Sequence, residues 1–186
     1  MYDQLKEALL STSALREDQK HTSRLVLENP TLVKPLLELI FSNDAEVSHK
    51  AAWILEFVCK EKLSLLFQHL DYFLTHAGKL QESSAIRPCA KVIQLMCEAR
   101  YVQEITMEVL YLPRKRKEKL TEICFDWLIA DIKVAPKAYS IYSLYWLGKD
   151  IDWIYPALIA QLKKDAPDQS AGYRATARKI LKKIEP

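Results

Sequence analysis

Apolar residues recur at spacings of three and four along most of the chain, with polar helix-start residues at the breaks between these runs. This spacing gathers apolar side chains on one face of an α-helix. The pattern predicts an all-α protein of about ten to eleven helices joined by short loops. The expected ranges are 2–10, 16–28, 31–41, 45–60, 63–77, 84–100, 103–111, 116–132, 135–148, 153–164 and 171–184.

Three of these helices carry a proline close to their start, namely Pro35, Pro88 and Pro156. A polar residue stands four places before each proline, and for Pro88 that residue is Ser84. Proline is tolerated in a first turn because its missing N–H would have no partner there. The spacing therefore predicts prolines in or near first turns and a serine cap at Ser84.

One apolar phase recurs four times, starting at Val47, Ala85, Val134 and Tyr173, with a small residue at the second slot and large residues at the next three. The four copies are Val47, Ala51, Ile54, Leu55, Val58; Ala85, Cys89, Val92, Ile93, Met96; Val134, Ala138, Ile141, Tyr142, Tyr145; and Tyr173, Ala177, Ile180, Leu181, Ile184. A helix with such a stripe cannot bury it alone. The repeat therefore predicts antiparallel helix pairs stacked into a right-handed superhelix, with an irregular helical bundle as the alternative.

Several segments resemble the HEAT repeat family and, more loosely, the armadillo repeats. They are Asp44 to Val47 with Ala51 to Leu55, the Pro35 segment, and the Pro156 segment with Tyr173 to Leu181. The resemblance implies a single HEAT-like α-α solenoid over residues 1–186. We expect residues 1–30 to form N-terminal capping helices and residues 31–186 to form the repeats.

The composition agrees with a helical fold: of 186 residues 49% are hydrophobic and only 3 are glycine, which excludes disorder and disfavours a turn-rich β-fold. The start of the chain has no basic region followed by a long apolar run, and no stretch has the ~18 apolar residues of a membrane helix. We expect a cytoplasmic, bacterial-type protein with no membrane partner. Its cysteines, without CxxC spacing, are expected to be buried free thiols rather than disulfides or metal ligands.

Catalytic patterns are sparse in the sequence. His69 and His76 are seven residues apart, which is too far for both to bind one metal ion from the same helix. No glycine-rich phosphate loop is present in the sequence. The segment from Gln81 to Lys91 is faintly similar to the signature loop of the adenylosuccinate lyase type, but it lacks the methionine, the asparagine and the glycines. We expect no catalytic residue, metal, cofactor or small-molecule substrate, and a helical lyase is the third and disfavoured function.

Two kinds of surface could bind another macromolecule. If the repeat helices line one side of the superhelix, basic and aromatic residues form rows on that side: Lys50, Trp53, Lys91, Lys137, Tyr139, Arg178 and Lys179. A compact basic run consists of Arg114, Lys115, Arg116, Lys117 and Lys119. The rows favour a non-enzymatic scaffold that binds a protein or peptide on its concave face.

The alternative is a nucleic-acid-binding protein. Some HEAT-like proteins are DNA glycosylases that use Trp and Asp, so Trp53, Asp126 and Trp127 are candidates, although Trp127 stands at a core spacing. The basic run could hold phosphates or simply be a solvated helix end. Because the net charge is only +3, we expect any nucleic-acid binding to be weak.

Overall fold

The computed structural model describes residues 2–102 and 112–185, and all regular structure in these ranges is helical. Ten α-helices are present among them, and short 3-10 helices at Pro30–Leu32 and Leu63–His69 precede the third and fifth. The helix predicted over 103–111 lies outside the described residues. The helices are α1 (Tyr2–Ser11), α2 (Arg16–Glu28), α3 (Val33–Ile40), α4 (Ala45–Lys62), α5 (Leu70–Ala77), α6 (Ser83–Tyr101), α7 (Arg114–Ile129), α8 (Val134–Leu147), α9 (Ile154–Asp165) and α10 (Ala171–Ile184).

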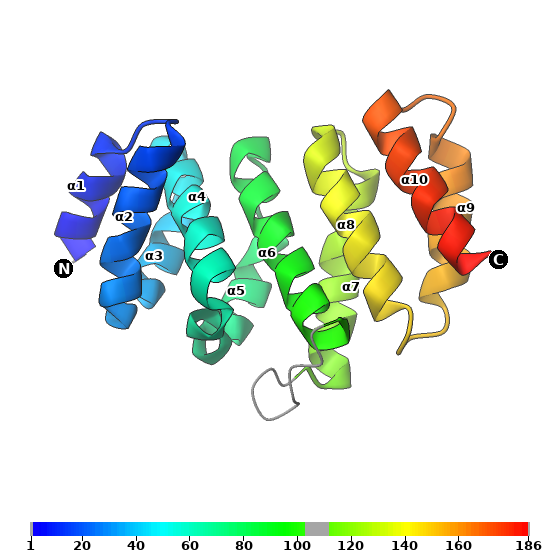
Figure 1. Cartoon of the computed structure of the whole chain (residues 1–186), viewed down its shortest axis with the longest axis horizontal. Coiled ribbons are helices and arrows are strands. Elements are labelled where there is room, and N and C mark those ends of the chain that lie inside the picture. Colours follow the sequence, from blue (N-terminus) through cyan, green and yellow to red (C-terminus); the bar gives the residue numbers. More distant parts are fainter. Residues whose placement is uncertain (1, 103–111, 186) are drawn as a thin grey trace.

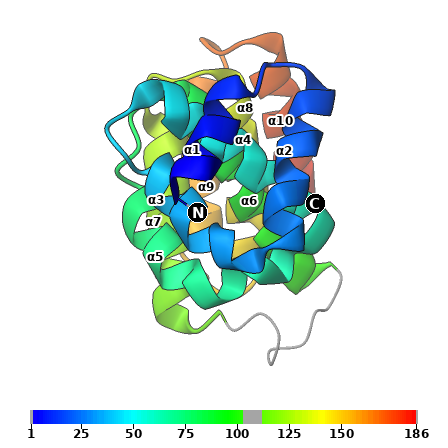
Figure 2. The same cartoon turned by 90° about the vertical axis from the view of Figure 1, so that its left-hand side faces the viewer.

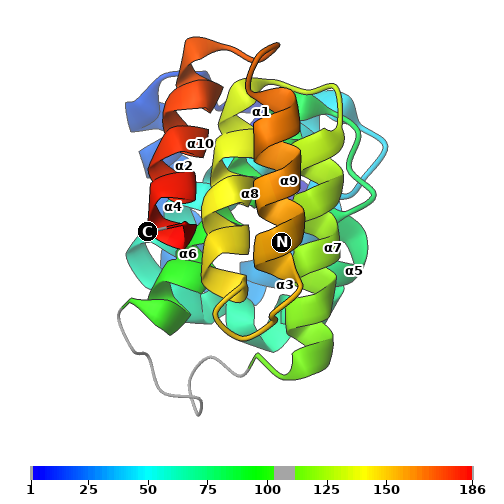
Figure 3. The same cartoon turned by 90° about the vertical axis from the view of Figure 1, so that its right-hand side faces the viewer.

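The helices form two layers along an elongated stack. The even-numbered helices run side by side in the order α2, α4, α6, α8, α10, and the odd-numbered helices lie behind them (Figure 1). The two layers are also separate in views from either end of the stack (Figures 2 and 3). The termini lie at opposite ends (Figure 1). Stacked helix pairs with a continuous core confirm the predicted all-α solenoid.

The core lies between the two layers and follows the predicted repeat in most of the stack. Every residue of the first two copies, in α4 and α6, is fully or almost fully buried. The fourth copy is buried at Tyr173, Ala177 and Ile180. Ala52, which was outside the predicted phase, is also fully buried, so the buried side of α4 is wider than one stripe.

The third copy, in α8, was predicted one residue out of phase. Val134, Ala138, Tyr142 and Tyr145 are only half-buried. The buried side of α8 consists of Pro136, Lys137, Ser140, Ile141, Ser143, Leu144 and Leu147. The error arose because tyrosines were counted as core residues, whereas serines and a lysine occupy part of the true buried side. The exposed side of α8 is therefore unusually aromatic.

The helix starts agree with the sequence only in part. Asp44 caps α4 by accepting a hydrogen bond from the Val47 N–H at 3.2 Å. Pro35 and Pro156 lie in the first turns of α3 and α9, as predicted. The cap predicted at Ser84 is wrong, because α6 begins at Ser83 and Pro88 lies inside the helix.

The four cysteines are free and buried, as predicted. Burial raises the pKa of the Cys97 thiol to about 12, so the thiol stays protonated at neutral pH. Trp127 is also buried in the core, at 3% exposure. These residues pack the solenoid and offer no reactive group at its surface.

In the described part of the chain, no helix combines the length and the apolar character that crossing a membrane requires.

Candidate interaction surface

The sides of the even-numbered helices that point away from the odd-numbered layer form one long surface, which we call the even-helix face. Trp53 of α4, Lys91 of α6, Tyr139 of α8 and Lys179 of α10 belong to the exposed or half-exposed sides of their helices. The Lys91 ammonium lies over the Tyr139 ring, 5.2 Å from its centroid. Four predicted site residues therefore stand on the surface where the sequence placed them.

The centre of this surface is the exposed side of α8. It consists of four half-buried rings, Tyr139, Tyr142, Tyr145 and Trp146, which we call the α8 aromatic face. The spacing of three and four residues places these rings on one side of the helix. Lys137 is the one charged residue of α8, and it is buried. The aromatic face therefore carries no charge of its own.

Lysines from the neighbouring helices cover the rings of this face. Lys91 of α6 lies over Tyr139, while Lys179 and Lys183 of α10 lie 5.4 and 5.2 Å from the ring centroids of Tyr142 and Tyr145. These distances are within the ~6 Å at which a cation is attracted to an aromatic ring. The three lysines, which we call the lysine rim, flank α8 on both sides.

Trp146 is enclosed in a similar way near the carboxyl end of α8. The Lys149 ammonium lies 4.5 Å from the Trp146 ring centroid, and the Tyr101 ring stacks on Trp146 at 6.4 Å. Tyr101 donates a hydrogen bond from its hydroxyl to Asp150 at 2.5 Å. Partial burial and this hydrogen bond raise the pKa of Tyr101. The rings of Tyr101 and Trp146 therefore pack against each other and against Lys149, which leaves less ring surface for a ligand.

The basic side chains of α10 are exposed and lack acidic partners. The helix contains Arg174, Arg178, Lys179, Lys182 and Lys183 and no acidic residue. Among the described residues, none of these five forms an ion pair. Their charges are therefore available to a ligand.

The α4 and α6 part of the even-helix face is internally neutralised. The Glu56 carboxylate is buried and accepts hydrogen bonds from Lys60 at 2.5 Å and from Arg87 at 2.7 Å. On α6, Gln94 accepts from Lys91 and donates to Glu98. On α4, Trp53 packs edge-on against His49. This part of the surface is polar but nearly balanced in charge.

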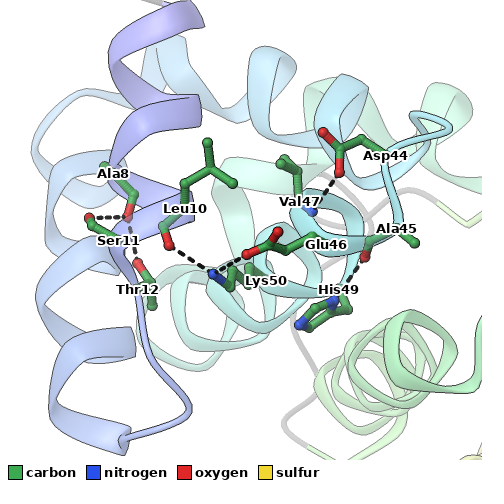
Figure 4. Close-up of polar contacts among 10 residues, drawn as sticks. All are labelled: Ala8, Leu10, Ser11, Thr12, Asp44, Ala45, Glu46, Val47, His49 and Lys50. Carbon is green, nitrogen blue, oxygen red and sulfur yellow. Dashed lines mark hydrogen bonds and ion pairs between the residues drawn. The ribbon is translucent and has the colours of Figure 1, made fainter.

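Lys50 holds two helices together instead of facing a ligand (Figure 4). Its ammonium donates to the Leu10 carbonyl at 2.8 Å and to Glu46 at 3.1 Å. Leu10 lies in the last turn of α1, where backbone carbonyls have no partner within the helix. Lys50 therefore joins α1 to α4, and its side chain is only 13% exposed.

Two other predicted members of the rows also lie elsewhere. Lys137 is 6% exposed and occupies the buried side of α8, because the phase of that helix differs by one residue from the prediction. Arg178 is exposed but lines a cavity of about 400 Å³ with Ala166 and Leu181. That cavity is lined by α10 and by the turn after α9, at the carboxyl end of the stack, and Tyr139 is not among its lining residues.

The basic run forms the start of α7, and acidic side chains neutralise most of it. Arg116 donates two hydrogen bonds to Asp71 of α5, at 2.7 and 2.8 Å. Lys117 pairs with Asp150. Arg114 and Lys119 pair along the helix with Glu118 and Glu122. The hydrogen bond from Arg116 lowers the pKa of Asp71. Only Lys115 lacks an ion pair within the described residues.

The residues considered for catalysis or metal binding are not brought together. Within residues 2–102 and 112–185, no three His, Cys, Asp or Glu side chains are grouped to hold a metal ion. His76 bonds the Tyr72 carbonyl and stacks on Phe41. Ser84 lies in the first turn of α6, and Lys91 two turns later contacts Tyr139. These contacts belong to helix packing.

Sequence reasoning missed Tyr142, Tyr145 and Trp146 as surface residues. The signal that could have found them is the proline in each helix. Aligning Pro136 with Pro88 places Ile141 opposite Ile93 and Leu144 opposite Met96, which is the phase that the structure has. In that register the tyrosines fall on the exposed side.

Comparison with known proteins supplies one match. A family model described as HEAT repeat domain matches residues 6–184, nearly the whole chain. Searches of curated proteins and of solved structures found no match. The matched range begins in α1 and ends with α10, so it includes every helix pair of the stack. This chain belongs to the HEAT repeat family.

Proposed function

We propose that this chain is a non-enzymatic HEAT repeat scaffold that binds a protein or peptide on the even-helix face. The observation that carries the proposal is the α8 aromatic face, flanked by lysines from α6 and α10. Aromatic side chains are enriched at the centres of protein interfaces, where they supply contact area at a low cost in entropy. Stacked repeats present such a surface to an extended partner.

Two features favour a protein over nucleic acid, the alternative partner. Bases bind single-strand sites by stacking on open aromatic rings, but lysines already lie over Tyr139, Tyr142 and Tyr145. The strongest basic run of the sequence is largely paired with Asp71, Glu118, Glu122 and Asp150. A glycosylase-like role loses a further candidate, because Trp127 is buried.

We also propose that residues 1–30 cap the stack and that residues 31–186 form its repeats. The buried hydroxyls of Thr12 and Thr22 share a hydrogen bond of 2.7 Å, which joins the linker after α1 to α2. Lys50 fixes the end of α1 to α4. The four free thiols fit a reducing compartment, which supports a cytoplasmic location.

The test is site-specific photocrosslinking in cells. A photoreactive phenylalanine analogue replaces Tyr139 on the even-helix face or, as the matched control, Phe125 on α7 in the opposite layer. We expect one protein adduct of defined mass from position 139 and none from position 125. The identified partner, once purified, should lose affinity for the Tyr142→Ala variant. Adducts from position 125 alone, or to nucleic acid, would contradict the proposal.

A further inference from the structure

We infer that the lysine rim and the α8 aromatic face bind an extended acidic segment, rich in Asp and Glu, of the partner protein. The inference rests on the proposed function and adds the chemistry of the ligand. It concerns the part of the even-helix face between α6 and α10. The residues that carry it are Lys91, Lys179, Lys183, Tyr139 and Tyr142.

The charge of this region is positive, and on the α10 side it is uncompensated. Lys179 and Lys183 have no ion pair among the described residues. Lys91 lies over the Tyr139 ring and has no direct carboxylate contact in the described structure, because the Gln94 amide stands between it and Glu98. The exposed side of α8 between them contributes no acidic residue. A ligand that complements this region must carry negative charge.

The polar atoms of this region are hydrogen-bond donors, so they favour a ligand that carries acceptor oxygens. In the described structure, the hydroxyls of Tyr139, Tyr142 and Tyr145 have no hydrogen-bond partner, so each can donate to a ligand. Lysine ammonium groups donate only. Carboxylates accept from both kinds of donor, and such charge-assisted hydrogen bonds are the stronger ones.

The lysines are also held in place before a ligand binds. Each ammonium lies over a ring at 5.2 to 5.4 Å, which restricts a side chain that otherwise loses much rotamer freedom on binding. The same contacts cover one face of each ring. Carboxylates reach the ammonium groups from outside, whereas bases would have to displace them. The arrangement therefore favours an acidic peptide over a single-stranded nucleic acid.

The positions of the lysines require an extended ligand. Lys91 comes from α6 and Lys183 from α10, on opposite sides of α8 in the layer that Figure 1 shows. A single carboxylate cannot contact both. A segment with acidic residues at several positions, crossing α8, contacts the whole rim.

The experiment measures fluorescence anisotropy of a short labelled peptide of Asp, Glu and Ser with the full chain. The Lys179→Gln, Lys183→Gln double variant should bind about tenfold more weakly, since two charge-assisted contacts are lost. The matched control, Lys164→Gln with Lys182→Gln, removes the same charge from exposed lysines outside the rim. It should change the affinity less than about twofold.

A further variant separates the hydroxyl from the ring. Tyr142→Phe keeps the ring under Lys179 and removes only the donor, so we expect a loss of about threefold. Circular dichroism checks that each variant keeps its helical content. Equal losses in the rim variant and in the matched control would overturn the inference, because a diffuse charge effect explains them.

Different experimental results would show that the inference has failed and that the proposed function has failed. If the wild-type chain does not bind the acidic peptide but a protein still crosslinks at position 139, the inference is wrong and the scaffold proposal stands. If labelled single-stranded oligonucleotide binds more tightly than the peptide and loses affinity in the rim variant, the ligand is nucleic acid. That result would overturn both.

Discussion

The chain has two clusters of five basic residues, and their environments are opposite. The first, at the start of α7, is compact in sequence, yet four of its members pair with carboxylates. The second is spread along α10, where no ion pair forms among the described residues and two lysines lie over tyrosines of α8. A dense run of basic residues in the sequence therefore does not by itself indicate positive charge that a partner can reach.

Helix electrostatics explains the contrast. Cations at the amino end of a helix oppose its dipole, whereas cations in the last turn are favourable. The first turn of α7 contains basic residues and no acidic one, so it depends on Asp71 and Asp150 from neighbouring segments. Lys182 and Lys183 stand in the last turn of α10 and need no such compensation. We therefore expect the first cluster to stabilise the fold and the rim lysines of the second to be available to a partner.

The largest expected difference is in stability. Changing Arg116, Lys117 and Lys119 together to Ala should lower the free energy of unfolding by about 1 to 3 kcal/mol, because three pairs are lost and two of them join separate segments. Chemical denaturation followed by circular dichroism measures it. The control changes Arg178, Lys182 and Lys183 to Ala, and its loss should be clearly smaller. A greater loss in the control would reverse the assignment of roles.

A single conservative change sharpens the same contrast. Arg116→Lys keeps the charge but loses the two-pronged contact with Asp71, so we expect a loss of about 0.5 to 1 kcal/mol. The matched change, Arg178→Lys, should leave the free energy of unfolding within about 0.3 kcal/mol, since Arg178 has no carboxylate partner in the described structure. Thermal unfolding of the two variants side by side gives the comparison.

Acid should weaken the α7 cluster. Hydrogen bonds from Arg116 lower the pKa of Asp71, and those from Lys117 and Tyr101 lower that of Asp150 against the opposing effect of partial burial. A carboxylate with a lowered folded-state pKa contributes stability above its unfolded pKa and loses it as pH falls through the folded one. Stability should therefore decline below the usual aspartate range, and less steeply in Asp71→Asn. An unchanged acid slope in that variant would exclude the contribution of Asp71.

The smallest effects are expected at exposed cations without carboxylate partners. Lys115→Gln and Lys179→Gln should each change the free energy of unfolding by less than about 0.5 kcal/mol. They should differ in binding, because only Lys179 belongs to the lysine rim. Denaturation and peptide anisotropy on the same samples check both statements. A loss of peptide affinity in Lys115→Gln would extend the binding surface to α7.

The sequence was informative where burial depends on simple periodicity. Ala51 and Cys89 are buried as the repeat predicts, because apolar spacing of three and four leaves little choice of face in α4 and α6. Ala52 is an exception, because it is fully buried although it lies outside the predicted apolar stripe. A helix with neighbours on three sides buries more than one stripe, and the width of contact depends on the stack rather than on the helix.

The interaction surface could be predicted only in part. Trp53, Lys91, Tyr139 and Lys179 stand on the exposed sides of their helices. Lys50 instead bonds the distant Leu10 carbonyl, and Lys137 falls on the buried side of α8. Tyrosine is the source of the ambiguity in α8. Its ring fits a core and its hydroxyl fits a surface, so periodicity alone does not assign Tyr142 or Tyr145. The pairing of Arg116 and Lys117 could not be predicted either, because their partners Asp71 and Asp150 lie far away in sequence.

The most direct test of the central claim, that the partner binds at the α8 aromatic face, is an NMR titration of the chain with ring-labelled tyrosine and tryptophan. On addition of the acidic peptide, the account predicts shifts for Tyr139, Tyr142 and Tyr145 and unchanged signals for Tyr72 and Trp153 in the odd-numbered layer. Shifts confined to Tyr72 and Trp153 would contradict it.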